Sequence, residues 1–89
     1  MSTVFIALQA NEETRPIIEA IEIDNPQAVV HRQPAMVKID AQGRLVIRRA
    51  TIEEQVGRDF DLQEIHINLI SLTGHVVEDD ETLTLSWND

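Results

Sequence analysis

The residues of this chain that could bind a metal ion are few and poorly spaced. Its three histidines are His31, His66 and His75. A zinc site usually takes closely spaced ligands, and a catalytic zinc ion takes three protein ligands. No two of these histidines stand one helical turn apart, and the chain has no cysteine. The pattern therefore predicts no metal site, no thiolate chemistry and no disulfide framework.

Two runs of carboxylates could suggest a cation site or acid–base catalysis. Asp59 and Asp61 begin like a calcium loop, but the glycine and the distal glutamate that such a loop needs are missing. The run Glu78–Glu81 could catalyse proton transfer only inside an enclosed site, and a domain of 89 residues offers no obvious cleft there. We therefore interpret both runs as solvent-facing turns.

Nucleophilic and nucleotide-binding chemistry also lack their signatures. The chain has no Gly-x-Ser-x-Gly elbow, and no serine stands beside a histidine. Its three glycines are isolated, so neither a phosphate-binding loop nor a dinucleotide fingerprint exists. One enzymatic hypothesis stays open, in which His66 and Glu64 share a strand face and act as an acid–base pair.

The charge of the chain restricts its partners. It has 16 acidic and 7 basic residues and a formal net charge of −9, which argues against nucleic acid and against anionic membranes. A basic protein partner is compatible with this charge, since complementary charges speed encounter; simple solubility is the alternative explanation. Lys38, Arg44, Arg48 and Arg49 would form a local basic hairpin, which is either a solvated face or an interaction patch.

The elements that would position these residues follow from periodicity and turn signals. Val4–Leu8 is an apolar, partly β-branched run that is typical of a strand. Apolar residues recur at helical spacing through Ile17–Ile23. Thr14 is the expected N-cap of this helix, and Asn25 with Pro26 ends it.

The middle of the chain predicts strands joined by a tight turn. Ala28–His31 is a short strand, and Met36–Asp40 alternates between polar and apolar residues. Gly43 can take the positive φ of a turn, after which Leu45–Arg49 would return as the second strand of a hairpin.

A second short helix and a long strand follow. Thr51 and Glu54 match a capping box at the start of the helix, and Gly57 fits the position just past its end. Leu62–Leu72 predicts the longest strand. The alternation of apolar residues changes phase at Leu69-Ile70, which indicates a bulge there.

These elements predict a single α+β domain over residues 1–89. Thr82–Trp87 closes the fold as a strand, with Leu83 and Leu85 on its core face and Trp87 plugging the core. The predicted order contains the motif β-α-β-β twice, in a mostly antiparallel sheet with two short helices. No apolar run approaches the ~20 residues of a membrane span, and no signal peptide is evident, so we expect a cytoplasmic protein.

Several short segments, spread over nearly the whole chain, carry a specific order and spacing. They are Arg15–Ile21, Asp24–Pro26, Pro34–Met36, Lys38–Asp40, Gly43–Leu45, Thr51–Glu54, Gly57–Asp61 and Asn68–Leu72. As a set they resemble the small effector proteins, also called coupling or regulatory proteins, of bacterial multicomponent diiron monooxygenases. The nearest likeness is to the phenol hydroxylase type within the methane monooxygenase regulatory protein B family.

This resemblance implies a protein without metal, organic cofactor or catalytic residues of its own. It implies binding to the α subunit of a carboxylate-bridged diiron hydroxylase, near the helices that hold the iron ligands. Binding would couple NADH-derived electrons, supplied by a flavin/iron–sulfur reductase, to O2-dependent hydroxylation of phenol or a related aromatic compound. The alternative is a generic protein-interaction module of another assembly.

The resemblance and the expected exposure together point to two docking segments. One comprises the second predicted helix and the turn after it, and the other surrounds the proline before the alternating strand. The candidate partner-binding residues are Pro34, Met36, Glu53, Glu54, Arg58 and Asp59.

Overall fold

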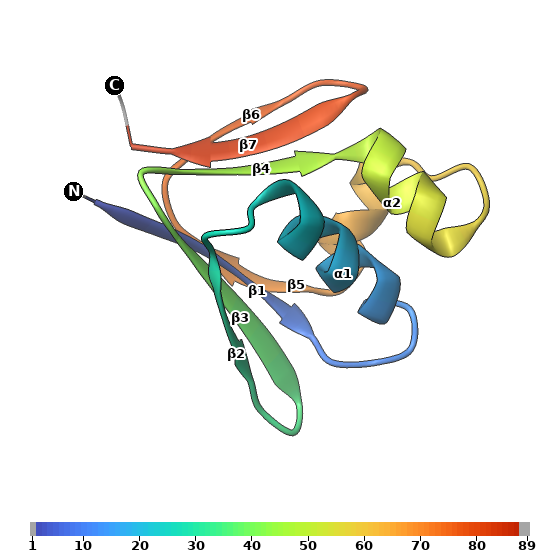
Figure 1. Cartoon of the computed structure of the whole chain (residues 1–89), viewed down its shortest axis with the longest axis horizontal. Helices are drawn as coiled ribbons and strands as arrows, with labels where there is room; N and C mark the ends of the chain where they lie inside the picture. Colours follow the sequence, from blue (N-terminus) through green and yellow to red (C-terminus); the bar gives the residue numbers. More distant parts are fainter. Residues whose placement is uncertain (1, 88–89) are drawn as a thin grey trace.

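The computed structural model of the chain describes residues 2–87, which form seven strands, two α-helices and one 3₁₀ helix (Figure 1). The strands are β1 (Thr3–Gln9), β2 (Val29–Arg32), β3 (Met36–Gln42), β4 (Arg44–Arg48), β5 (Leu69–Leu72), β6 (His75–Glu78) and β7 (Thr82–Ser86). The helices are α1 (Arg15–Asp24), α2 (Arg49–Val56) and the 3₁₀ helix η1 (Leu62–Ile67). The predicted α+β class is confirmed.

The strands form two antiparallel sheets rather than one. The four-stranded sheet has the order β2-β3-β1-β5, and the three-stranded sheet has the order β4-β7-β6. Figure 1 shows the two sheets diverging from the β3–β4 corner, with α1 and α2 packed side by side in the open angle. One cluster of buried, mostly aliphatic side chains joins both sheets to all three helices.

The predicted pair of β-α-β-β motifs is present, and both copies have the same strand order. In the second copy, however, the strand paired with β7 is β6 (His75–Glu78), which the sequence did not predict, and not Leu62–Leu72. In the first copy, the β2–β3 hairpin follows α1, and β3 pairs with β1. In the second copy, the β6–β7 hairpin follows α2, and β7 pairs with β4. The second copy also contains an insertion, because η1 and β5 lie between α2 and β6, and β5 pairs with β1 in the other sheet.

The predicted hairpin between Met36–Asp40 and Leu45–Arg49 is wrong. Gly43 does have a positive φ of 78°, but it forms a corner at which the chain leaves one sheet for the other. Leu45 and Ile47 of β4 stand opposite Leu85 and Leu83 of β7, which buries all four side chains. Burial against β7 therefore outweighs local pairing, and the expected basic hairpin is divided between two sheets.

The long strand predicted over Leu62–Leu72 is also wrong in its first half. Residues 62–67 form η1, because Asp61 and Glu64 make a capping box: Asp61 Oδ1 accepts from the N–H of Gln63 (2.9 Å), and Glu64 Oε2 accepts from the N–H of Asp61 (3.1 Å). The predicted bulge is confirmed, since β1 pairs with Leu69 and then with Ser71 while Ile70 is left over.

Helix ends differ from their predicted caps. α2 begins at Arg49, so Thr51 lies inside the helix and does not form the predicted capping box with Glu54. Thr14 precedes α1, but its side chain does not cap that helix; its Oγ1 accepts from the N–H of Asn11, whose Oδ1 accepts from the N–H of Thr14. These capping hydrogen bonds therefore close the turn before α1 and not the first turn of the helix itself. Gly57 ends α2 as predicted, with a φ of 77°.

The closing strand fits its prediction except at its end. Leu83 and Leu85 are buried on the core face of β7. Trp87 does not plug the core: 44% of it is exposed, and its indole N–H donates to the carbonyl of Thr3 at 3.0 Å. Among residues 2–87, no helix is long and apolar enough to cross a membrane.

Candidate docking surface

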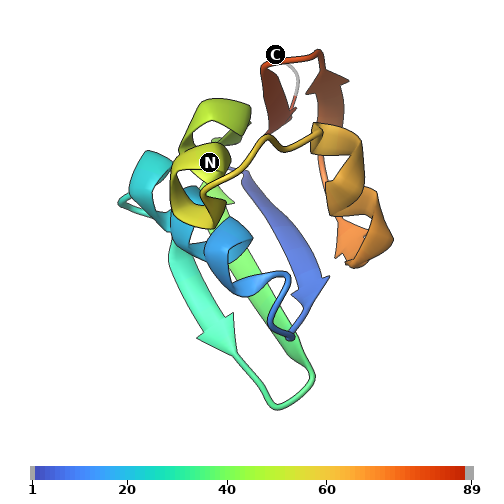
Figure 2. The ribbon, with the colours of Figure 1, turned by 90° about the vertical axis from the view of Figure 1, so that its right-hand side faces the viewer.

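The structure separates the two predicted docking segments. Glu53, Glu54, Arg58 and Asp59 gather on α2 and on the turn that follows it. Pro34 and Met36 belong to the β2–β3 turn and the start of β3, which project at the bottom of both views (Figures 1 and 2). In both views α2 lies at the opposite, upper side of the molecule. The two segments therefore lie on different parts of the molecular surface.

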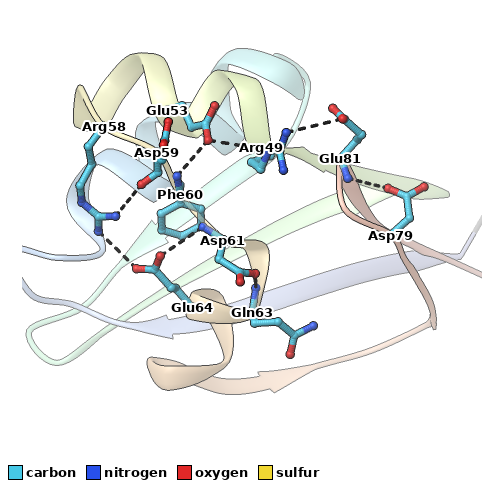
Figure 3. Close-up of polar contacts among 10 residues, drawn as sticks. All are labelled: Arg49, Glu53, Arg58, Asp59, Phe60, Asp61, Gln63, Glu64, Asp79 and Glu81. Carbon is cyan, nitrogen blue, oxygen red and sulfur yellow. Dashed lines mark hydrogen bonds and ion pairs between the residues drawn. The ribbon is translucent and has the colours of Figure 1, made fainter.

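Glu53 is a structural residue as much as a surface residue. Its Oε2 accepts from the backbone N–H of Phe60 at 2.9 Å and lies 3.7 Å from Nε of Arg49 (Figure 3). The Arg49 guanidinium also lies 3.5 Å from the Glu81 carboxylate. These contacts fix the turn after α2 against the helix and link α2 to the β6–β7 turn.

Arg58 organises the other side of the same turn. It donates to the carbonyl of Asp59 at 2.7 Å and to Oε1 of Glu64 at 3.2 Å (Figure 3). Its guanidinium also lies 5.8 Å from the centre of the Phe60 ring. The backbone N–H of Asp61, and then the Arg58 side chain, hold the pKa of Glu64 below its ordinary value. The turn is therefore pre-formed and carries charge of both signs.

The acidic run Glu78–Glu81 forms the β6–β7 turn. Asp79 Oδ1 accepts from the N–H groups of Thr82 and Glu81, both at 2.8 Å, and these bonds lower the pKa of Asp79. Glu78 accepts from Nε2 of Gln63 at 2.9 Å, so the end of β6 is tied to η1. This arrangement is a hydrogen-bonded turn on the surface, as interpreted from the sequence.

The structure does not bring His66 and Glu64 together as an acid–base pair. Both residues lie in η1 rather than on a strand face. His66 Nε2 lies 3.3 Å from Oε1 of Glu78, whereas Glu64 is bound by Arg58 and by the N–H of Asp61. Within residues 2–87, no group of three or more His, Asp and Glu side chains could hold a metal ion.

Two solvent-open hollows flank η1. The larger, of about 730 Å³, lies between α2, η1 and the β6–β7 turn, and the smaller, of about 320 Å³, lies between the start of α1, the end of α2 and η1. Carboxylates dominate the lining of the larger hollow, with Arg49 as its only basic residue. An open, charged surface of this kind suits contact with another protein better than enclosure of a small molecule.

The sequence interpretation missed Asp61, Phe60 and Glu64 as members of this surface. The sequence does contain a signal for η1, because Asp61-Leu-Gln-Glu64 is itself a capping-box pattern. The apolar alternation of residues 65, 67 and 69 favoured a strand and concealed it.

Residues 2–86 match the sequence profile of the MmoB/DmpM family. The chain belongs to this family. Among its relatives, it is 48% identical over 88 residues to the stimulatory component DmpM of phenol 2-monooxygenase from Pseudomonas sp. (strain CF600), covering 99% of this chain and 98% of the relative. The resemblance inferred from the sequence is thus confirmed.

Two solved structures agree with this fold. A chain from a complex of phenol hydroxylase with its regulatory protein superimposes with a TM-score of 0.93 at 50% identity, over 98% of this chain and 100% of that one. The regulatory protein B of soluble methane monooxygenase shares the fold with a TM-score of 0.76 at 23% identity, over 97% of this chain and 65% of that one.

Proposed function

We propose that this chain is the non-catalytic regulatory component of a phenol-type multicomponent monooxygenase. The observation that carries this proposal is the identity of 48%, over nearly the full length of both chains, to a stimulatory component of phenol 2-monooxygenase. The match to a chain from a phenol hydroxylase–regulatory protein complex supports binding to the hydroxylase component.

The finer assignments belong to the same proposal. The partner is the α subunit of a carboxylate-bridged diiron hydroxylase, and a flavin/iron–sulfur reductase supplies the electrons. The regulatory chain itself uses no cofactor and acts in the cytoplasm. Iron then belongs to the hydroxylase rather than to this chain.

A regulatory role requires unequal binding to two states of the hydroxylase. A ligand shifts a conformational equilibrium only by the difference between its affinities for the two states. The turn after α2 suits this role because the contacts of Glu53 and Arg58 already fix its conformation. Little conformational entropy is then lost on docking, so more of the contact energy can discriminate between the states.

We assign the main docking contacts to the turn surface formed by Glu53, Glu54, Arg58 and Asp59. Pro34 and Met36 would make a separate contact through the β2–β3 turn. The support is their position: Glu54, Arg58, Asp59 and Pro34 are exposed, and Met36 and Glu53 are half-buried.

The proposed function is tested by titrating this chain into a purified phenol hydroxylase and its reductase. We expect aromatic hydroxylation to rise to an optimum near an equimolar ratio, with little NADH consumed without product. Aromatic hydroxylation by this chain alone would favour an enzyme. Binding to other proteins but not to the hydroxylase would favour a generic interaction module.

The docking assignment is tested by reversing charges on the turn surface. The double variant Glu54→Lys with Arg58→Glu should slow association with the hydroxylase several-fold at low salt, because rim charges act mainly on encounter. Glu19→Lys with Arg44→Glu is the matched control, since both of these residues are exposed elsewhere. Equal affinity and turnover for both double variants would contradict the assignment.

A further inference from the structure

The smaller hollow beside η1 is a groove lined by both polar and apolar residues. Ile17 of α1 and Phe60 lie buried beneath it, and Pro16 and Val56 are half-buried, so they expose some apolar surface to it. Polar groups line the remainder, among them Glu12 and Glu64. The groove thus combines apolar surface with carboxylates at the junction of three helices.

Ile67 stands at the rim of this groove with 71% of its surface exposed. Isolated exposed aliphatic residues are common and need no explanation. Ile67 differs because it lines the same hollow as the half-buried Pro16 and Val56, and contiguous apolar surface rimmed by polar groups marks contact sites. It is the last residue of η1, which belongs to the insertion of the second β-α-β-β copy.

The negative charge of the chain is concentrated on this side of the molecule. The two hollows together are lined by nine carboxylates and two guanidinium groups, which carry −7 of the formal net charge of −9. The carboxylates are Glu12, Glu13, Glu53, Asp59, Asp61, Glu64, Glu78, Asp79 and Asp80, and the guanidinium groups are Arg49 and Arg58. The field on this side of the molecule therefore attracts cationic surfaces. At the groove itself, Glu12 is paired with Arg15 (2.6 Å) and Glu64 with Arg58 (3.2 Å), so the larger hollow supplies most of this field.

We propose that this groove receives a segment of the hydroxylase surface that inserts an aliphatic side chain beside Ile67 and surrounds it with Lys or Arg. The proposal rests on the proposed function and adds a specific contact to it. Ile67 and the half-buried apolar side chains beside it provide the affinity, since contacts that become buried at the centre of an interface carry most binding energy. The surrounding carboxylates provide fast encounter and select a basic partner.

The apolar part is tested with Ile67→Glu against Ile23→Glu. Ile23 is a matched control because it is also an exposed isoleucine (56%), at the other end of α1 from the groove. We expect Ile67→Glu to weaken binding to the purified hydroxylase by about tenfold or more, while Ile23→Glu and the melting temperatures of both variants stay near those of the unmodified chain.

The outcomes separate this inference from the function on which it rests. If the unmodified chain binds the hydroxylase and both variants bind equally well, the groove assignment is overturned and the regulatory function stands. If the unmodified chain does not bind, the proposed function fails and the groove assignment fails with it.

The electrostatic part is tested with Glu13→Lys at the groove against Glu19→Lys on α1, both at exposed positions. We expect Glu13→Lys to slow association with the hydroxylase more than Glu19→Lys at low salt, and the difference to disappear when salt screens the charges. Equal rates for the two variants would overturn the role of the acidic rim.

Discussion

The two β-α-β-β copies in this molecule share a strand order but differ in how the helix connects to the hairpin. In the first copy, only residues 25–28 separate α1 from β2. In the second copy, residues 57–74 separate α2 from β6 and include η1 and β5. The shared frame, meaning the strands, helix and hairpin that both copies have in common, supplies most of the buried aliphatic core, to which the insertion adds Leu62 and Ile65. Both solvent-open hollows border the exposed side of the insertion. The candidate docking surface thus lies where α2 of the frame meets the insertion.

The two copies also differ in their polar contacts, although the insertion has a buried polar side chain, Asn68, whose Oδ1 accepts from Nδ2 of Asn11 at 2.9 Å. In the first copy, the buried hydroxyl of Thr14 donates to the carbonyl of Gln9 at 2.6 Å, and Asn25 bridges α1 to β4. In the insertion, Arg58 and Glu64 meet at the surface, where 58% and 37% of their side chains are exposed. Exposed ion pairs contribute little to stability, so the insertion can vary its charge for a partner at low cost to the fold.

The largest loss of stability should come from truncating core residues of the shared frame, and the loss should be equal in the two copies. Ile39 of β3 and Ile47 of β4 are both fully buried. Truncating either residue to alanine should destabilise the protein by about 2–5 kcal/mol, because each change leaves a cavity in the same core. Urea denaturation measures this loss. Ile67→Ala in the insertion is the control and should change stability by less than about 0.5 kcal/mol. A large loss at Ile67 would contradict the division between frame and insertion.

An intermediate loss of stability should come from removing the side-chain amide of Asn25, which joins the two copies. Asn25 Nδ2 donates to the carbonyls of Ile21 (2.8 Å) and Val46 (2.7 Å), and its Oδ1 accepts from the N–H of Val46 (3.0 Å). Asn25→Ala would remove all three bonds and leave the backbone groups of β4 without partners. We expect a loss of about 1–3 kcal/mol in the free energy of unfolding. The neighbouring exposed Gln27→Ala should have almost no effect, and an equal loss in both variants would show that the bridge is unimportant.

The spacing of apolar residues in the sequence predicted the elements of the shared frame, because burial in the core determines that spacing. The β1 strand, the apolar face of α1 and the core face of β7 all repeat at the spacing of their elements, so the sequence records which side faces the core. The spacing of apolar residues does not show which strands pair with one another when they are far apart in the sequence. The partner of β4 depends on which strand offers Leu83 and Leu85, and local alternation does not distinguish β3 from β7 as that partner.

The insertion was harder to predict because two local signals conflict there. Ile65 and Ile67 alternate like a strand, while Asp61 and Glu64 cap a helical turn; two hydrogen bonds to backbone N–H groups decide in favour of the turn. The candidate docking surface stays a prediction. Its charged residues on α2 and the turn after it come from the family resemblance and the expected exposure, whereas the groove arises only when η1 folds against α1 and α2.

The smallest loss of stability should come from substituting Glu64 near the surface turn. The pH dependence of this loss should distinguish the surface turn from the shared frame. The folded-state pKa of Glu64 is lowered, first by the N–H of Asp61 and then by Arg58. Its carboxylate therefore stabilises the fold above its ordinary pKa of 4.5, and this contribution is lost as the pH falls through the lower folded-state value.

Glu64→Gln should therefore lower the free energy of unfolding at about pH 7 by roughly 0.5 kcal/mol or less, since exposed pairs contribute little. The difference from the unmodified chain should shrink as the pH is lowered through the folded-state pKa of Glu64, where the native carboxyl group takes up its proton. Thermal melts over a series of pH values measure this change. The deficit of Ile47→Ala should instead stay constant with pH, because the cavity that it leaves carries no charge. If the Glu64→Gln deficit also stayed constant, the side chain would be acting through its shape and hydrogen bonds, and the turn would belong to the frame rather than to the charged surface.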